Sequence, residues 1–344
     1  MKRIAIEEHC YTKEYLSYMY SRKECPRWEI VEDEKHRKID RWWRAPSLPP
    51  IDFGPDGTRI TDKLTDLGEG RLREMDKAGI DMAVLSLGNP GVDGFEAADG
   101  TIWAKKTNDQ LAEVVKRYPK RFAALATLAL ADPQGAADEL KRAVTELGLK
   151  GALTFSHVHG EYLDDRKYWI VLETAEKLGV PIYIHPTFPS PDMLKPYSGY
   201  SGLSTSAWGF AAEAGLHAVR LILSGVFDEY PGLTIILGHL GEALPFWMWR
   251  MDNRLNRLSS LNKKHKRKPS DYIKDNFFVT TSGMFWEPPF LCTYLGLGAD
   301  NILFAVDYPH ESNEVAVQFM DSVPICDGDK EKIYHLNAEK LFSL

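Results

Sequence analysis

Short runs of apolar and β-branched residues recur along most of the chain, separated by longer amphipathic stretches. Runs of four to eight such residues are typical of buried strands, whereas apolar positions that repeat every three or four residues are typical of helices. Eight runs predict strands: Arg3 to Glu7, Met82 to Leu87, Phe122 to Leu128, Gly151 to Phe155, Pro181 to His185, Leu233 to Gly238, Phe277 to Thr281 and Asn301 to Val306.

Helical periodicity follows each strand except the first, where it starts only after a long irregular stretch. The predicted helices are Gly68 to Ala78, Ile102 to Tyr118, Pro133 to Leu147, Tyr168 to Leu178, Ser206 to Phe227, Ala243 to Leu261, Glu287 to Leu297 and Ser312 to Met320. Strands that alternate with helices in this way form parallel sheets. Eight such units fit a (β/α)8 barrel better than an open sheet, so we expect an α/β chain with one TIM-like barrel domain over residues 1–344.

The stretch from Tyr11 to Thr65 interrupts this alternation. It is rich in charged residues, Trp and Pro and has no clear period, so it predicts an insertion of about residues 11–65 after the first strand. One interpretation is an oversized loop on the catalytic face of the barrel, where Trp42, Trp43 and Phe53 could pack against a ring-shaped substrate. The other is a surface excursion used for contacts between subunits.

Composition excludes several classes of partner. The chain has 344 residues, of which 44% are hydrophobic, and is long enough to bury a sizeable core. Its net charge of -7 and its pI near 5.8 argue against binding to nucleic acid or to an anionic membrane, because both call for a basic face. The single basic run, Asn262 to Lys268, is expected to be a solvated helix end or loop. A small molecule is therefore the expected substrate.

Cysteines and apolar segments bear on the cellular compartment. The four cysteines form no C-x-x-C pair and are too sparse for a disulfide scaffold, which favours reduced thiols. No run of 18 apolar residues is present, and the N-terminus leads straight into the first predicted strand. We expect neither a signal peptide nor a membrane span, and a cytoplasmic location.

Ionisable residues cluster at the ends of four predicted strands. The first strand ends in Glu7-Glu8-His9, the fifth in His185, the sixth is followed by His239, and the eighth by Asp307. In a parallel barrel the carboxyl ends of all strands meet at one mouth. These positions, which are remote in sequence, are therefore expected to share one pocket.

The residue types at these ends suit a divalent metal ion. Side chains alternate along a strand, so Glu7 and His9 point to the same face while Glu8 points away. With His185 and Asp307 they would supply two imidazole nitrogens and two carboxylate oxygens, a ligand set for Zn or Mn, with Mg as a further candidate. Any one histidine taken alone is more often a hydrogen-bonded structural residue, but four residues of this kind at strand ends favour a metal site.

The segment His239-Leu240-Gly241-Glu242 suggests a proton-transfer group. The flanking glycines would let the backbone turn sharply, and Glu242 could orient the imidazole of His239 through a hydrogen bond. A carboxylate that stabilises the N-terminus of the next helix is compatible with the same geometry.

The motifs built on these residues are similar to those of the amidohydrolase superfamily. The closest resemblance is to its aminocarboxymuconate-semialdehyde-decarboxylase-like branch of metal-dependent nonoxidative decarboxylases, and within that to gamma-resorcylate and 5-carboxyvanillate decarboxylases. The resemblance extends over nearly the whole chain. The matching motifs and segments are Glu7-x-His9, Tyr183-Ile-His-Pro, Leu237-Gly-His-Leu-Gly-Glu, Asp307-Tyr-Pro, Asp66-Leu-Gly-Glu, Met75-Asp-Lys-Ala-Gly-Ile-Asp, Leu221 to Asp228 and Glu242 to Arg250.

The resemblance implies roles for individual residues. Glu7, His9, His185 and Asp307 would bind one divalent metal ion. Asp307 would protonate the substrate ring, and His239 with Glu242 would assist the charge on the phenol. Substrate contacts would come from Arg250, Arg59 and His185, with Arg250 reaching into a neighbouring subunit, which implies a homodimer or homotetramer.

The function implied is the decarboxylation of an ortho-hydroxybenzoate-type acid in aromatic compound catabolism. One alternative is a metal-dependent hydrolase or hydratase acting on a lactone or a ring-cleavage product, because the same ligands can activate water. A second is a noncatalytic barrel that only binds a metal or a ligand, which the full set of ligand and acid-base residues disfavours.

Overall fold

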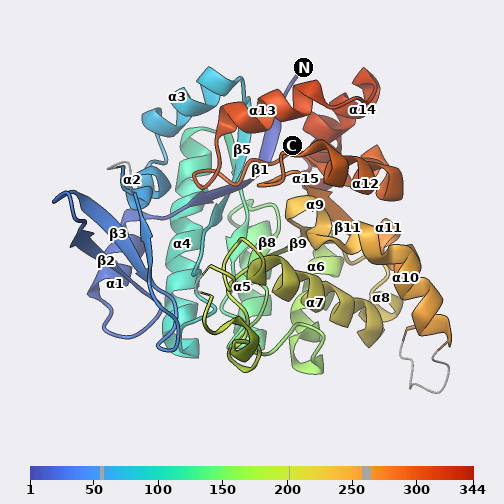
Figure 1. Cartoon of the computed structure of the whole chain (residues 1–344), viewed down its shortest axis with the longest axis horizontal. Helices are drawn as coiled ribbons and strands as arrows, with labels where there is room; N and C mark the ends of the chain where they lie inside the picture. The colour runs from blue at the N-terminus through green and yellow to red at the C-terminus, as the bar shows by residue number, and fades with distance from the viewer. Residues whose placement is uncertain (55–57, 201, 258–264) are drawn as a thin grey trace.

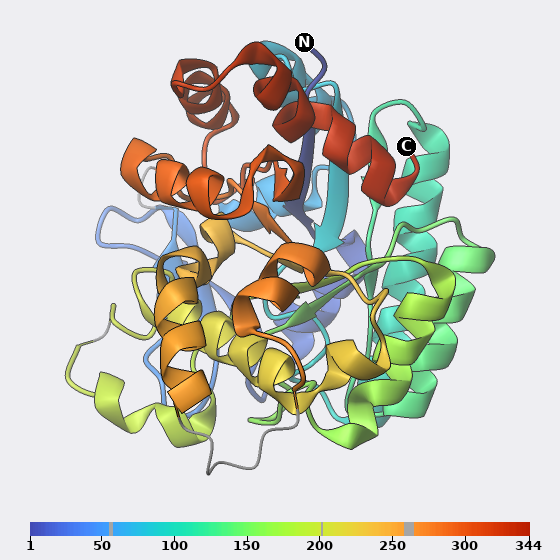
Figure 2. The same ribbon diagram turned by 90° about the vertical axis from the view of Figure 1, so that its right-hand side faces the viewer.

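Parallel strands surrounded by helices form the body of the molecule in a computed structural model, which describes residues 1–54, 58–200, 202–257 and 265–344 (Figures 1 and 2). The strands are β1 (Ile4–Cys10), β5 (Met82–Leu87), β6 (Phe122–Ala124), β7 (Ala126–Thr127), β8 (Ala152–Phe155), β9 (Ile182–His185), β10 (Ile235–Leu237), β11 (Phe277–Thr280) and β12 (Ile302–Leu303). Each of the eight predicted strands is present, and the predicted run Phe122 to Leu128 is divided into β6 and β7 at Leu125.

Backbone hydrogen bonds close these strands into a barrel. One parallel sheet has the order β1-β5-β6 and another the order β12-β11-β10-β9-β8-β7. The two sheets meet at two seams. At the seam between β6 and β7, Leu125 N donates to Leu85 O at 2.9 Å and Ala126 N donates to Gly151 O at 2.8 Å. At the other seam Ile6 N donates to Phe304 O at 3.2 Å. The predicted (β/α)8 fold class is confirmed.

The predicted helices are also present, and all but Glu287 to Leu297 have shifted ends. Residues 258–261, at the end of the predicted helix Ala243 to Leu261, lie outside the described residues. They are α3 (Glu69–Ala78), α4 (Ala97–Arg117), α5 (Pro133–Thr145), α6 (Trp169–Leu178), α7 (Gly209–Ser224), α10 (Leu244–Arg257), α12 (Glu287–Leu297) and α13 (Asn313–Ser322). The predicted helix Ser206 to Phe227 is interrupted at Gly225, whose φ of 86° ends α7, and α8 (Val226–Glu229) follows. Short helices that the periodicity did not indicate are α11 (Pro269–Asn276), α14 (Asp327–Glu331) and α15 (Asn337–Phe342).

The described residues of the insertion, 11–54 and 58–65, contain regular strands and helices and form a small subdomain. It comprises α1 (Lys13–Ser21), the antiparallel strands β2 (Arg27–Glu32), β3 (Lys38–Trp43) and β4 (Ile51–Phe53), and α2 (Ile60–Thr65). In Figure 1 this sheet lies at the end of the molecule toward which β1 runs. The alternation of apolar and polar residues expected for a strand is interrupted in β3. Asp40 is fully buried there, at a position where the alternating pattern calls for an apolar residue.

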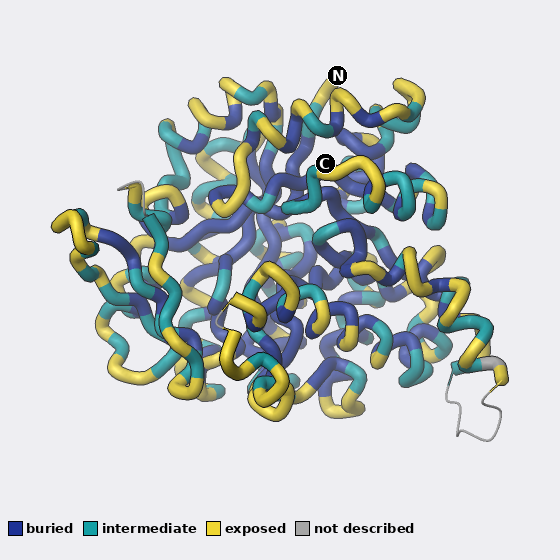
Figure 3. Tube along the Cα trace, viewed as in Figure 1, coloured by how far each residue is buried: buried dark blue, intermediate teal, exposed yellow. Residues whose placement is uncertain are grey.

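Buried side chains form an inner and an outer layer. The segments whose residues are buried run through the centre of the molecule (Figure 3). The barrel interior contains Ile4, Ile6, Leu153, Tyr183 and Ile236 among others, and a larger layer lies between strands and helices. Within the described residues no helix is both long and apolar enough to cross a membrane. Of the basic run Asn262 to Lys268, residues 262–264 lie outside the described residues, and Lys266, Arg267 and Lys268 are exposed.

A polar face of α7 holds the loop that follows β8 at the barrel mouth. The imidazole Nε2 of buried His217 accepts a hydrogen bond from Leu163 N at 3.0 Å, and Arg220 donates to both carboxylate oxygens of Asp164, at 2.8 and 3.0 Å. Burial lowers the pKa of His217 to about 3, so the imidazole remains a neutral acceptor.

Replacing His217 by Phe should destabilise the protein in a pH-dependent way. The buried Leu163 N–H loses its acceptor, which typically costs about 1–3 kcal/mol. Because burial lowers the pKa from 6.5 to about 3, the stabilisation is complete above pH 6.5 and is lost as the pH falls toward 3. Urea denaturation should therefore show a large gap between wild type and variant at pH 7.5 and a smaller one at pH 5.5. An equal gap at both pH values would contradict the assignment, and the exposed His36→Gln serves as control.

Candidate active site

Four strand ends bring the predicted ionisable residues together at the mouth of the barrel. Glu7 and His9 lie in β1, His185 is the last residue of β9, His239 follows β10 after a single glycine, and Asp307 lies four residues beyond β12. The backbone places Asp307 directly, because its N–H donates to Glu7 O at 3.0 Å across the seam between β12 and β1.

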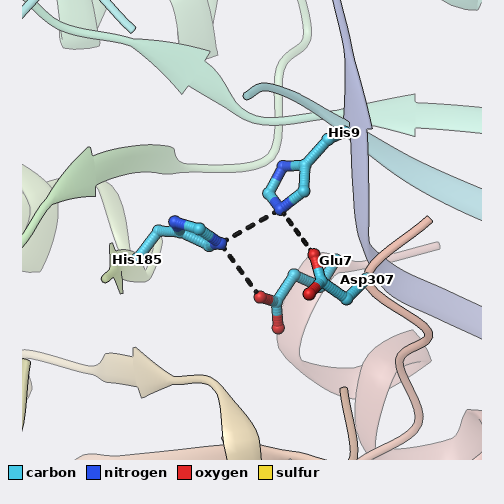
Figure 4. Close-up of side chains that lie close together, drawn as sticks. All are labelled: Glu7, His9, His185 and Asp307. Carbon is cyan, nitrogen blue, oxygen red and sulfur yellow. Dashed lines mark hydrogen bonds and ion pairs between the residues drawn. The ribbon is translucent and has the colours of Figure 1, made fainter. Parts of the chain in front are cut away.

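Glu7, His9, His185 and Asp307 each direct one ligand atom toward a common point (Figure 4). These four atoms all lie within 4.8 Å of one another. The two Nε2 atoms of His9 and His185 are 3.0 Å apart, His9 Nε2 is 3.1 Å from Asp307 Oδ1, and His185 Nε2 is 3.2 Å from Glu7 Oε1. The cluster is nearly closed to solvent, since Asp307 has the most exposed side chain at 16%.

The donor atoms of this cluster are arranged for a cation. Glu7 Oε1 and Asp307 Oδ1 are buried, and neither has a hydrogen-bond partner in the part of the chain that the structure describes. Buried carboxylate oxygens normally have donors, so a convergent pair without them calls for a positive charge at the centre. Two imidazoles with two carboxylates fit one divalent ion such as Mn or Zn.

A β-bulge in β1 turns Glu7 into the barrel. Ala5 pairs with Ala83 but Glu8 pairs with Leu85, so β1 contains one extra residue between these two points. Ile6 packs in the barrel interior, and the bulge allows the next residue, Glu7, to face inward as well. His9 then follows on the same side and Glu8 faces away, as alternation predicts.

The other oxygen of Glu7 is fully bonded within the protein. Glu7 Oε2 accepts hydrogen bonds from the hydroxyls of Tyr183, Thr280 (3.0 Å) and Ser282. Sequence reasoning missed these three hydroxyl residues. Their positions in the sequence could have indicated them. Tyr183 lies two residues before His185, on the same face of β9. Thr280 is the last residue of β11, and Ser282 lies two residues beyond it.

His239 and Glu242 lie in a left-handed turn beside the metal cluster. Residues 239–243 all have positive φ, with 50° at His239 and 51° at Glu242. Each non-glycine residue in a left-handed helical conformation costs about 1–2 kcal/mol, so a run of this length must be held by its surroundings. The turn brings His239 Nδ1 to 2.8 Å from Glu242 Oε1, which confirms the expected hydrogen bond.

The opposite ring nitrogen of His239 faces the metal cluster. His239 Nε2 lies 3.8 Å from both Glu7 Oε1 and Asp307 Oδ2. Burial alone would lower the pKa of His239, but the negative charges of Glu242 and Glu7 outweigh it and raise the pKa well above its usual value. An imidazole with one nitrogen on a carboxylate and the other beside the reacting centre is suited to proton transfer.

The two predicted substrate arginines lie in different settings. Arg59 is bonded within the subdomain, because its Nε donates to the fully buried Asp40 at 3.0 Å and its Nη2 donates to Tyr20 and Thr61. Arg250 is exposed on α10. Neither arginine is among the residues that converge on the cluster.

One edge of the subdomain contacts the cluster through aromatic rings. The Phe53 ring lies 6.1 Å from that of His310, which is 5.9 Å from the ring of His9. Phe53 also contacts Trp28, which stacks on Trp42. The subdomain therefore forms an aromatic wall close to the candidate metal ligands, while Trp42 itself is buried in the wall.

Comparison with known proteins finds relatives among amidohydrolases and decarboxylases. The family model described as amidohydrolase matches residues 44–344. Gamma-resorcylate decarboxylase of Polaromonas sp. strain JS666 is 40% identical over 297 residues, which cover 84% of this chain and 91% of that enzyme.

Solved structures agree with this similarity. The crystal structure of 5-carboxyvanillate decarboxylase from Sphingomonas paucimobilis matches with a TM-score of 0.87 and 34% identity, covering 100% of this chain and 99% of the other. A dihydroxybenzoic acid decarboxylase from Polaromonas sp. JS666, with bound manganese and the inhibitor 2-nitroresorcinol, matches with a TM-score of 0.84 and 36% identity, covering 100% and 97%. The four-residue cluster is thus a site for one divalent metal ion.

Replacing Glu7 by Gln should weaken metal binding by more than the ~10–100-fold that is typical for the outer partners of a metal ligand. The substitution removes the charge of a carboxylate oxygen that faces the centre. Its control is Glu8→Gln, because Glu8 is also buried and one residue away but faces the opposite side. Manganese content measured by elemental analysis after dialysis should fall only for Glu7→Gln. Equal metal content in both variants would exclude Glu7 as a ligand.

Proposed function

Because this chain belongs to the amidohydrolase family, we propose that it is a metal-dependent, nonoxidative decarboxylase of an ortho-hydroxybenzoate-type acid. The observation that carries the proposal is the convergence of Glu7, His9, His185 and Asp307 on one point with the His239–Glu242 pair beside it. A carboxy-lyase of this kind would act in aromatic compound catabolism.

The chemistry of the relatives' ligands supports this substrate class. The manganese-containing relative was solved with 2-nitroresorcinol, a ring with a nitro group between two hydroxyls. A nitro group resembles a carboxylate in shape, so the inhibitor resembles a benzoate with ortho hydroxyls. When bound, the metal ion supplies positive charge that holds the neighbouring carboxylate and phenol oxygens of such an acid.

The residues of the chain would then carry the proton. Asp307 protonates the ring carbon that bears the carboxylate, and the bond to the carboxylate breaks as its electron pair returns to the ring and CO2 leaves. The proton on Asp307 comes from the ortho hydroxyl of the substrate, because His239 and His9 hold the pKa of the carboxyl well below its usual range although burial alone would raise it. His239, oriented by Glu242, steadies the negative charge on the phenol oxygen.

Further contacts and assembly belong to the same proposal. Arg250, Arg59 and His185 would contact the substrate, with Arg250 doing so in a neighbouring subunit of a homodimer or homotetramer. Supporting the assembly, α10 exposes Phe246 and Trp249 next to Arg250, and exposed aromatic residues of this kind are typical of contact surfaces. A cytoplasmic location and either Mn or Zn as the resident metal complete the proposal.

The activity should appear as metal-dependent release of CO2 from one member of a small panel of ortho-hydroxybenzoates. The measurement combines a CO2 assay with the ultraviolet change of the ring, using protein of known metal content and a chelated sample as control. Turnover that the chelator abolishes would support the proposal. Water-dependent product formation without CO2, with labelled water oxygen in the product, would instead assign a hydrolase or hydratase.

Asp307→Asn should reduce turnover by about 10²–10⁴-fold, the usual contribution of a general acid or base. The Asn side chain keeps one oxygen for the metal but cannot donate the carboxyl proton. It also tolerates the positive φ of 78° at this position better than most residues. Metal content and binding of 2-nitroresorcinol should persist. Retained turnover would refute the role of Asp307 as proton donor.

A further inference from the structure

Glu7 occupies one of the most enclosed polar positions in the molecule. Its side chain has no exposure to solvent, and it reaches the metal cluster from inside the barrel. A carboxylate buried in this way is stable only if its charge is compensated and its oxygens have donors. The two oxygens meet this requirement in different ways.

Three hydroxyl groups surround Glu7 Oε2. Tyr183 comes from β9, Thr280 ends β11 and Ser282 follows it, and all three are fully buried. Each donates its hydroxyl proton to Oε2, and the hydroxyls also contact one another, with 2.8 Å between Thr280 and Ser282 and 3.3 Å between Tyr183 and Thr280.

The backbone leaves room for this arrangement at one position. A Cβ on Gly238 would lie 3.2 Å from Glu7 Oε2, 3.3 Å from Oε1 and 3.2 Å from the Tyr183 hydroxyl. These contacts are tighter than van der Waals packing allows without movement, so Gly238 gives the carboxylate and its donors the space they occupy.

Because Oε2 of Glu7 is occupied by three hydroxyl donors, only Oε1 is left to bind an ion. Glu7 Oε1 has no hydrogen-bond partner among the residues described, and it faces His185 Nε2 at 3.2 Å. We propose that the hydroxyls of Tyr183, Thr280 and Ser282 are positioning groups of the metal centre, which hold Glu7 so that it binds the ion through Oε1 alone. The inference rests on the metal site of the proposed function but does not depend on which acid is the substrate.

Ser282 extends the same arrangement to the proton-transfer group. Its Oγ donates to Glu7 Oε2 and accepts a hydrogen bond from the backbone N–H of His239 at 3.2 Å. One hydroxyl therefore links the metal ligand to the first residue of the left-handed turn. Loss of this hydroxyl should disturb metal binding and the placement of His239 together, whereas loss of the Thr280 hydroxyl should disturb metal binding alone.

The test is the affinity of the metal-free full chain for Mn²⁺, measured from the electron paramagnetic resonance signal of the free ion. Tyr183→Phe, Thr280→Val and Ser282→Ala each remove one hydroxyl with little change of volume. Each should weaken Mn²⁺ binding by ~10–100-fold, the range typical for partners of a metal ligand. Thr280→Ser, which keeps the hydroxyl, should bind Mn²⁺ like the wild type.

The matched control is Thr281→Val. Thr281 is also fully buried, but its hydroxyl exchanges hydrogen bonds with the backbone of Ala305 at 3.0 Å instead of contacting Glu7. A similar fall in Mn²⁺ affinity for this control would mean that general loosening of the barrel explains the effect, and would overturn the inference. Unchanged affinity in all three cluster variants would overturn it as well.

Failure of the decarboxylase proposal would be recognised separately. The Mn²⁺ titration needs no substrate, so an inactive wild type with the expected pattern of affinities would leave the positioning role intact. Conversely, an active wild type whose Tyr183→Phe, Thr280→Val and Ser282→Ala variants all bind Mn²⁺ like the wild type would keep the function and remove the role of the hydroxyls.

Discussion

Two carboxylates held against one another at a nearly closed barrel mouth are the constraint on which this site depends. Glu7 is fully buried, Asp307 is 16% exposed, and their ligand atoms belong to one cluster 4.8 Å across or less. Carboxylates this close repel unless one is protonated or a cation lies between them. The neighbouring imidazoles present their Nε2 atoms to the same point, so a divalent ion neutralises the carboxylates and uses both nitrogens as ligands.

Departures from regular structure occur where this constraint acts. The bulge in β1 turns Glu7 inward, and the positive φ values of residues 239–243 bring Glu242 back onto the ring of His239. The positive φ values are locally unfavourable and are held by their surroundings, which include the Ser282 hydroxyl on His239 N. The bulge is accompanied by the hydrogen bond from Asp307 N to Glu7 O, which joins Glu7 to the segment after β12. The strained backbone at residues 239–243 thus belongs to the same segment as the candidate catalytic residues His239 and Glu242.

These departures also explain what the sequence could and could not predict. Strand and helix periods predicted the barrel, and polar residues at strand ends predicted the cluster, because the carboxyl ends of parallel strands must converge. The bulge leaves no mark in a pattern of period two, and hydroxyl residues such as Thr280 are common in strands for other reasons. The insertion of about residues 11–65 was predicted, but its strands and helices were not, because buried Asp40 interrupts the pattern of β3.

The same Asp40 holds the elements of the subdomain together. It accepts hydrogen bonds from Arg59, from Tyr20 and from both the backbone and the side chain of Thr61, which ties β3 to α1 and α2. With this anchor the edge of the sheet that carries Phe53 is fixed near the metal ligands through His310. A metal ion recognises the oxygen pair that all ortho-hydroxybenzoates share and cannot distinguish their remaining substituents. In the proposed function, discrimination among such acids would come from the walls around the ion, and the subdomain would supply an aromatic one through Phe53.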